Sequence, residues 1–186
     1  MTHALLGGFT DAPRDSAHAF RAAMNAMARP GRIVALTGAT APAPVSPAAA
    51  TLLLTLCDPD TPLWLAPSHD SDALRGWIAF HTGAPLAGPE TCRFALGTWD
   101  ALQPVDRFPV GTPEYPDRSA TLIVERPSLV SEGPSLSGPG IRGPVRLNLP
   151  EIGSFQRNAL LFPLGFDCIF TSGNRAAALP RSTRIA

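Results

Sequence analysis

Three stretches in the first half of the chain carry apolar residues at intervals of three or four positions, which is the spacing of one face of an α-helix. These stretches span residues 15–29, 46–57 and 70–81, and a helix is predicted over each of them. The apolar face of the first predicted helix consists of Ala17, Phe20, Met24 and Met27.

The residues that flank these stretches are typical of helix ends. Asp15 or Ser16 can cap the first helix, and Pro30 cannot continue it. Ser46 stands before a proline at the first position of the second helix. Gly83 follows the third helix, where a left-handed backbone conformation would close the last turn.

Short apolar and β-branched runs predict the strands. The clearest covers residues 120–124, and its composition is that of a strand buried on both faces of a sheet. A fourth helix is predicted over 151–161, and Gly173-Asn174 is predicted to turn the chain between the last two strands. Residues 97–117 contain four prolines and are predicted to lack regular structure. The other predicted strands cover 32–36, 63–65, 92–96, 145–149, 166–170 and 176–179, with one more around Leu136.

The order of these elements predicts the fold class. Helices and strands alternate early in the chain, and strands dominate later. Such an order favours an α/β domain of three layers around a central mixed sheet. We expect residues 1–186 to form a single domain, because this length can bury a continuous apolar core without metals or disulfides.

The charge composition excludes several classes of protein. Fifteen basic and fifteen acidic residues cancel, so neither nucleic acid nor an acidic membrane surface is an expected partner. All the basic residues are arginine. Without lysine, the chain can form no pyridoxal phosphate Schiff base and has neither a P-loop lysine nor a lysine general base.

Cysteines and histidines point to no metal site or disulfide. Cys57, Cys92 and Cys168 are far apart and odd in number, as expected of small buried apolar residues in a reducing compartment. The histidines at positions 3, 18, 69 and 81 do not pair at metal-ligand spacing. Residues 1–9 lack a basic region followed by a long apolar run, so a cytoplasmic location is expected.

Three titratable residues in loops and at helix ends admit more than one role. His81, at the end of a predicted helix, is interpreted either as a C-terminal cap or as a ligand or partner contact. Asp58 and Asp60 suit turn formation, although paired carboxylates can also perform acid-base chemistry. The segment 137–140 is interpreted as a chain reversal and not as a phosphate loop, because its proline lacks a backbone N–H that could donate to a phosphate.

Arginines near chain junctions are the remaining candidates. Arg29 stands where the first helix meets Pro30 and is a candidate for a carbonyl cap, a subunit contact or an anion ligand. The tail around Arg181 and Thr183 combines guanidinium groups with hydroxyls, which suits phosphate oxygens or partner carboxylates. A solvated, frayed terminus is the alternative interpretation of this tail.

A series of short motifs in order along nearly the whole chain resembles the PhnH family. One of them is Met24-Asn25-Ala26-Met27-Ala28-Arg29-Pro30-Gly31. No single motif is specific, but the ordered series is. The resembling segments lie within residues 20–31, 52–64, 80–82, 111–114, 120–122, 137–141, 162–167 and 180–183.

This resemblance implies a subunit of the bacterial carbon-phosphorus lyase system. Its group of subunits couples methylphosphonate to the ribose of ATP, giving α-D-ribose 1-methylphosphonate 5-triphosphate. The resemblance further implies an accessory role, a homodimer within a larger core complex, no cofactor, and a fold like that of pyridoxal phosphate-dependent transferases. It supplies no catalytic residues. The alternative function is an ATP- or phosphonate-binding enzyme subunit that uses arginines and His81, and the candidate contacts are Arg29, Asp60, His81, Arg181 and Thr183.

Overall fold

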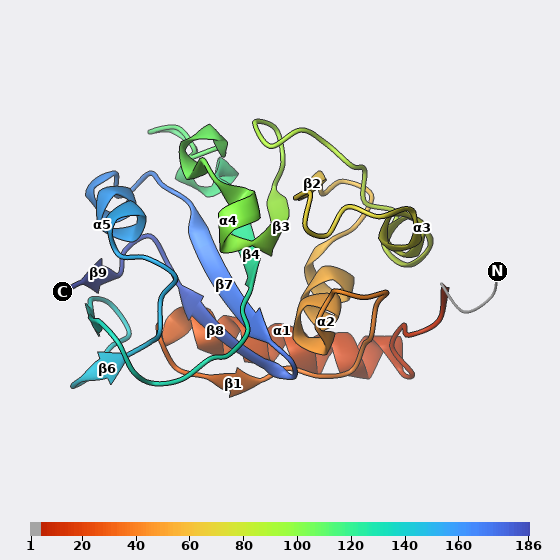
Figure 1. The fold of residues 1–186 in the computed structure, drawn as a ribbon, viewed down its shortest axis with the longest axis horizontal. Coiled ribbons are helices and arrows are strands. Elements are labelled where there is room, and N and C mark those ends of the chain that lie inside the picture. The colour runs from red at the N-terminus through yellow and green to blue at the C-terminus, as the bar shows by residue number, and fades with distance from the viewer. Residues whose placement is uncertain (1–4) are drawn as a thin grey trace.

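The computed structural model describes residues 5–186, and a six-stranded mixed sheet forms its centre (Figure 1). The strand order is β1-β8-β7-β4-β3-β2. β2, β3, β4 and β7 are parallel, whereas β8 and β1 run antiparallel to their neighbours. The prediction of an α/β protein with a mixed central sheet is confirmed. The strands are β1 Val34–Ala35, β2 Leu63–Leu65, β3 Phe94–Thr98, β4 Thr121–Glu125, β7 Asp167–Ser172 and β8 Arg175–Leu179.

The central sheet separates two apolar cores. In β4, Ile123 faces one core while Leu122 and Val124 face the other, since successive side chains of a strand point to opposite sides. All three side chains are fully buried. The continuous apolar run that predicted this strand therefore follows from cover on both faces.

Three helices pack into the first core: α1 Ala12–Ala28, α2 Pro47–Leu56 and α3 Asp72–His81. The side chains of Asp11, Ser46 and Ser71 cap them by accepting a backbone N–H from the first turn. The end of α3 is as predicted, because Gly83 has a φ of 66° and donates its N–H to Ile78.

The start of α1 differs from the prediction. The helix begins at Ala12 with Asp11 as its cap, so the prediction of Asp15 or Ser16 is wrong. Pro13 lies in the first turn of α1, where its missing N–H costs nothing because no intrahelical acceptor exists there. Asp15 instead accepts the backbone N–H of Asp11 at 2.9 Å, which reinforces the cap.

The buried face of α1 also differs from the prediction. Ala19, Ala23 and Ala26 face the core, whereas Phe20 and Met24 are 51% and 54% exposed. Alanines let α1 pack closely against α2 and β8, so the larger apolar side chains on the neighbouring face stay outside.

The second core is covered by shorter elements. They are α4 Trp99–Leu102, α5 Gly153–Leu160 and a second, antiparallel sheet in the order β6-β5-β9. The second sheet consists of β5 Ser135–Ser137, β6 Val145–Arg146 and β9 Arg184–Ile185. Residues 97–117 are not wholly irregular, because α4 and two 3₁₀ helices, Val105–Arg107 and Pro116–Arg118, begin within this stretch.

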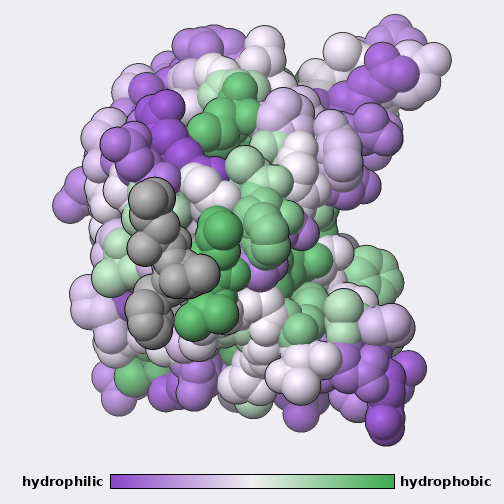
Figure 2. All heavy atoms as spheres, turned by 90° about the vertical axis from the view of Figure 1, so that its right-hand side faces the viewer, coloured by the Kyte–Doolittle hydropathy of each residue, from purple (hydrophilic) through white to green (hydrophobic). Residues whose placement is uncertain are grey.

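The end of the molecule beside α3 has a mixed surface. Figure 2 shows apolar side chains across the middle of this face and hydrophilic side chains around them. Near α3, Leu6 and Phe80 are 61% and 63% exposed. Within residues 5–186, no helix combines the length and the apolar character needed to cross a membrane.

Candidate functional site: an arginine-lined trough

A trough of about 1300 Å³ lies among the described residues, and we call it the arginine trough. One wall is residues 28–35, where α1 ends and β1 follows. The other wall is the segment that leads into β6, from Gly140 to Arg146. Ser131 and Arg175 complete the lining.

Five of the fifteen arginines line this trough, and no aspartate, glutamate or histidine does. The ion pairs found within residues 5–186 involve none of the five. The rest of the chain carries ten arginines against fifteen acidic residues, so a neutral protein concentrates positive charge at this one surface. The five arginines are Arg29, Arg32, Arg142, Arg146 and Arg175.

Two glycines bring the walls of the trough together. Gly31 has a φ of 78°, and a Cβ there would lie 2.6 Å from side-chain atoms of Leu136 and Val145. Gly140 has a φ of 80°, and a Cβ there would lie 2.0 Å from the carbonyl oxygen of Ala28. Only glycine permits both the backbone conformation and this close approach.

Two sheet edges border the trough. β1 is the outermost strand of the central sheet, and β6 is the outermost strand of the second sheet. Both strands contribute residues to the lining. Figure 1 shows them at the same side of the molecule, below the C-terminal strand β9. The trough therefore lies beside backbone that still has unused hydrogen-bonding capacity.

Arg29 is the one predicted candidate that lies in the trough. It follows the last residue of α1, and its backbone N–H donates to the carbonyl of Ala26 at 3.3 Å. Its side chain is exposed. The backbone of Arg29 thus closes the helix, while its guanidinium is available to an anion.

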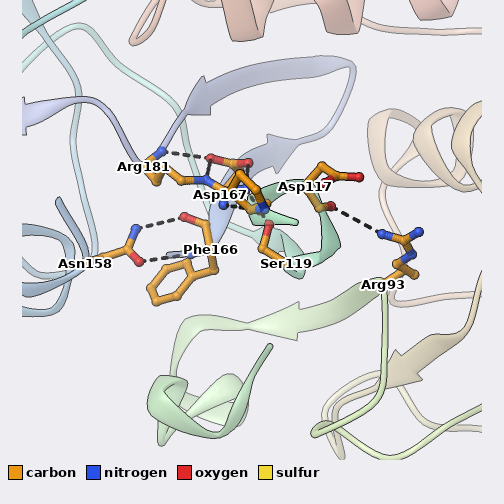
Figure 3. A network of polar contacts seen from close by, with 8 residues as sticks. Arg93, Asp117, Ser119, Asn158, Phe166, Asp167 and Arg181 are labelled. Carbon is orange, nitrogen blue, oxygen red and sulfur yellow. Dashed lines mark hydrogen bonds and ion pairs between the residues drawn. The ribbon is translucent and has the colours of Figure 1, made fainter. Parts of the chain in front are cut away.

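Arg181 lies at the centre of a polar network inside the protein (Figure 3). Its guanidinium donates to both carboxylate oxygens of Asp167, at 3.1 and 2.6 Å, to the carbonyl of Pro116 at 2.8 Å, and to the hydroxyl of Ser119. The side chains of Arg181 and Asp167 are only 13% and 15% exposed. All three nitrogens of this guanidinium are occupied within the chain.

Thr183 is buried in the ordered tail, where its Oγ1 has no hydrogen-bond partner. The tail continues into β9, in which Arg184 pairs with Ser137. The interpretation of the tail as frayed and solvated is therefore wrong. The backbone hydrogen bonds of β9 and the ion pair of Arg181 hold it in place.

His81 ends α3, and its ring contacts the start of the described chain. The Nε2 atom lies 2.9 Å from the carbonyl oxygen of Leu5, and the ring packs against Trp77. A Cβ on Gly8 would lie 2.7 Å from the same ring. His81 therefore holds residues that immediately precede α1.

Asp60 lies on an exposed turn between α2 and β2. The turn is held by Asp58, whose carboxylate accepts the backbone N–H of Asp60 at 3.0 Å and the hydroxyl of Thr61. The turn-forming interpretation of Asp58 is confirmed.

The five predicted candidates do not converge on one site. Arg29 lies at the carboxyl end of α1, and His81 lies beside the residues before its amino end. A helix of 17 residues is about 25 Å long, so one ligand of ordinary size cannot contact both. Asp60 and Arg181 lie outside the trough lining as well.

Sequence reasoning missed four of the trough arginines: Arg32, Arg142, Arg146 and Arg175. Arg32 lies close to Arg29 along the chain, and the run Ile141-Arg142-Gly143-Pro144-Val145-Arg146 is locally basic. Both features are visible in the sequence, but no local pattern shows that the segments around Arg32 and Arg142 lie opposite each other, with Arg175 beside them. That depends on the pairing of β1 with β8 and on the contacts made at Gly31 and Gly140.

The side chains of the trough suit binding and not proton transfer. Guanidinium groups donate to carboxylate or phosphate oxygens and do not lose their proton near neutral pH. No carboxylate or imidazole lines the trough to act as a general base. Within residues 5–186, no cluster of three histidine, cysteine, aspartate or glutamate side chains could hold a metal ion.

The buried cysteine thiols are unlike activated catalytic thiolates, and two other titratable groups outside the trough also have shifted pKa values. Burial raises the pKa of Cys57 and of Cys92 to about 12 and that of Cys168 well above the ordinary value, so all three are neutral thiols. Burial lowers the pKa of His69, whose Nδ1 lies 2.8 Å from the hydroxyl of Ser68. At the end of β4, burial raises the pKa of Glu125, which accepts the backbone N–H of Ser46 at 2.6 Å.

The structure is thus that of an α/β protein with a concave surface whose guanidinium groups can donate to anionic groups. Residues 7–186 match the family described as bacterial phosphonate metabolism protein (PhnH), and the chain belongs to this family.

Two relatives cover nearly the whole chain. One is the α-D-ribose 1-methylphosphonate 5-triphosphate synthase subunit PhnH of Rhizobium meliloti (strain 1021), 39% identical over 188 residues, with 96% of this chain and 94% of that protein covered. The other is HtxG of Stutzerimonas stutzeri, 35% identical, with 94% and 87% covered; its name gives it provisionally as a C-P lyase subunit. The family resemblance found in the sequence motifs is confirmed.

Proposed function

We propose that this chain is an accessory, non-catalytic subunit of a carbon-phosphorus lyase assembly. In this role it supports synthesis of α-D-ribose 1-methylphosphonate 5-triphosphate from ATP and methylphosphonate by its partner subunits. Family membership and the names of the two relatives support the pathway. The single observation that supports a binding role is the trough, which has five cationic side chains and no acid-base group.

The experiment that tests this proposal measures adenine release from ATP in the presence of methylphosphonate. The purified chain alone should release no adenine. The other subunits without this chain should show reduced release, and adding the chain back should restore it. Release of adenine by the chain alone, at a rate proportional to its concentration, would contradict the accessory role.

The finer parts of the proposal concern assembly and fold. The chain acts as one domain over residues 1–186, pairs as a homodimer and joins the other core subunits in the cytoplasm. The resemblance to pyridoxal phosphate-dependent transferases, without the cofactor, is part of the same proposal. Light scattering of the purified chain and co-purification with the neighbouring subunits test the assembly.

The alternative is an enzyme subunit that binds ATP or a phosphonate through arginines and His81. The trough arginines favour the anion-binding part of this alternative, but the length of α1 separates them from His81. Calorimetric titration with ATP and with methylphosphonate distinguishes the two proposals. The alternative requires saturable heat that His81→Ala and Arg29→Ala both weaken.

A further inference from the structure

We propose that the arginine trough receives an extended, acidic segment of a partner subunit, which adds a strand to the free edge of β1. This inference rests on the proposed function, because it requires an assembly with partner subunits. It identifies the surface of this chain that holds such a partner and the chemistry of the partner segment.

The first step concerns the backbone of β1. Leu36 donates its N–H to the carbonyl of Asn174 at 2.9 Å, and Val34 pairs with Ala176 on β8. In an antiparallel pair, alternate residues direct their N–H and C=O groups toward the partner strand. The backbone groups of Ile33 and Ala35 therefore point away from β8, and both residues line the trough.

The second step concerns charge. Arg32, Arg142 and Arg175 are exposed and line the trough from three different segments. An extended chain presents alternate side chains on the same side, so several carboxylates of one strand can face several of these guanidiniums at once. Arginine binds a carboxylate through two parallel hydrogen bonds, which adds orientation to the charge attraction.

The third step decides between a chain segment and a small anion. A volume of about 1300 Å³ exceeds the roughly 300–1000 Å³ typical of small-molecule pockets. Exposed guanidiniums attract a free anion only weakly, because water and salt screen them. A peptide strand gains backbone hydrogen bonds at the β1 edge in addition, as in other cases of strand addition.

The test uses the chain co-expressed with the other subunits of the assembly. Ala35 is exposed on the free edge of β1, and Ala35→p-benzoylphenylalanine places a photo-crosslinker there. The control is the same substitution at Arg21, which is exposed on α1. We expect a crosslink from position 35 to one partner subunit, mapped by mass spectrometry to an extended segment rich in aspartate and glutamate, and no such crosslink from position 21.

A second measurement removes the charge complementarity. The double variant Arg32→Glu/Arg142→Glu should lower the affinity for that partner by about tenfold or more, as expected for reversing two interfacial charges. Arg14→Glu/Arg21→Glu changes the net charge by the same amount at exposed positions of α1 outside the trough and should leave the affinity unchanged. Circular dichroism and thermal unfolding of the isolated variants establish that the fold is kept.

Several results would overturn the inference. A complex that forms normally without a crosslink from position 35 would contradict the proposal that an acidic strand adds to β1. A crosslink to a neutral or helical segment would contradict it as well. A crosslink to a second copy of this chain would make the edge a self-association surface. Saturable binding of sodium tripolyphosphate that Arg32→Glu/Arg142→Glu abolishes, with partner affinity unchanged, would make the trough a small-anion site. Failure of any complex to form would instead contradict the proposed function itself.

Discussion

Arginine is used in two opposite ways in this protein. Arg181 is almost buried and donates to Asp167, Pro116 and Ser119, so its hydrogen-bonding capacity is used inside the fold. The trough arginines are exposed and form none of the ion pairs found in the described part of the chain. The comparison shows that the partners of an arginine, and not its residue type, separate a structural role from a binding role.

The largest expected effect is on the structural side of this comparison. Arg181→Ala leaves the Asp167 carboxylate nearly buried without its cation, and breaking such a pair costs about 3–5 kcal/mol of unfolding free energy. Urea denaturation measures this loss. The double variant Arg181→Met/Asp167→Asn should recover part of it, because no unpaired charge remains. A loss below about 1 kcal/mol would mean that water replaces the pair at little cost.

A smaller loss is expected at the junction of the two regions. Gly140 lines both the trough and the neighbouring hollow beside Arg181. Gly140→Ala places a Cβ against the carbonyl oxygen of Ala28 at a positive φ, so we expect a loss of about 1–3 kcal/mol in thermal or urea unfolding. Gly173→Ala is the matched control, because its φ is also positive but nothing lies within 4 Å of the added Cβ.

Glu125 extends the comparison to an acidic group that is half-buried and forms none of the ion pairs found within residues 5–186. Burial raises its pKa in the folded state above the unfolded value, so the folded protein holds this proton more tightly. This group therefore lowers the unfolding free energy as pH rises from its unfolded pKa through its folded pKa. Glu125→Gln keeps an acceptor for the Ser46 N–H, and its stability should exceed that of the parent above this range and converge with it below.

The measurement for Glu125 is urea unfolding at a series of pH values, with Glu125→Ala as the control. Loss of the acceptor for Ser46 should make Glu125→Ala about 1–3 kcal/mol less stable than Glu125→Gln at every pH, because neither side chain titrates. Parallel pH profiles of Glu125→Gln and the parent protein would show that the carboxyl group does not titrate differently in the two states.

The smallest expected effect is on the binding side of the comparison. Arg32→Ala and Arg142→Ala remove exposed side chains without carboxylate partners and should change the unfolding free energy by less than about 0.5 kcal/mol. The same variants should weaken co-purification with partner subunits. A stability loss comparable with that of Arg181→Ala would show that the trough arginines serve the fold.

The elements that were predicted well are those with strong local signals. The apolar run of β4, the serine cap of α2 and the glycine after α3 each have a local physical cause, and the structure contains each of them. The local sequence pattern did not predict which face of α1 is buried, because packing against neighbouring elements decides this. Phe20 and Met24 have the expected helical spacing, but the close approach of α1 to β8 selects the alanine face.

The candidate site was less predictable than the fold. Arg29 was identified because it follows a helix, a local feature, whereas Arg175 reaches the trough only through strand pairing. Arg181 and Asp167 are 14 positions apart, and no local pattern shows that they form an ion pair. Contacts between distant segments therefore account for most of what the sequence did not show.

The free edge of β1 has a further consequence for the isolated chain in solution. An uncovered strand edge can pair with that of an identical molecule, and like charges beside it oppose such an encounter. Added salt shortens the range of this repulsion to about 3 Å at 1 M. We therefore expect the proposed homodimer to remain dispersed at low ionic strength and to associate further as salt is added, whereas the solubility of most proteins rises when a little salt is added.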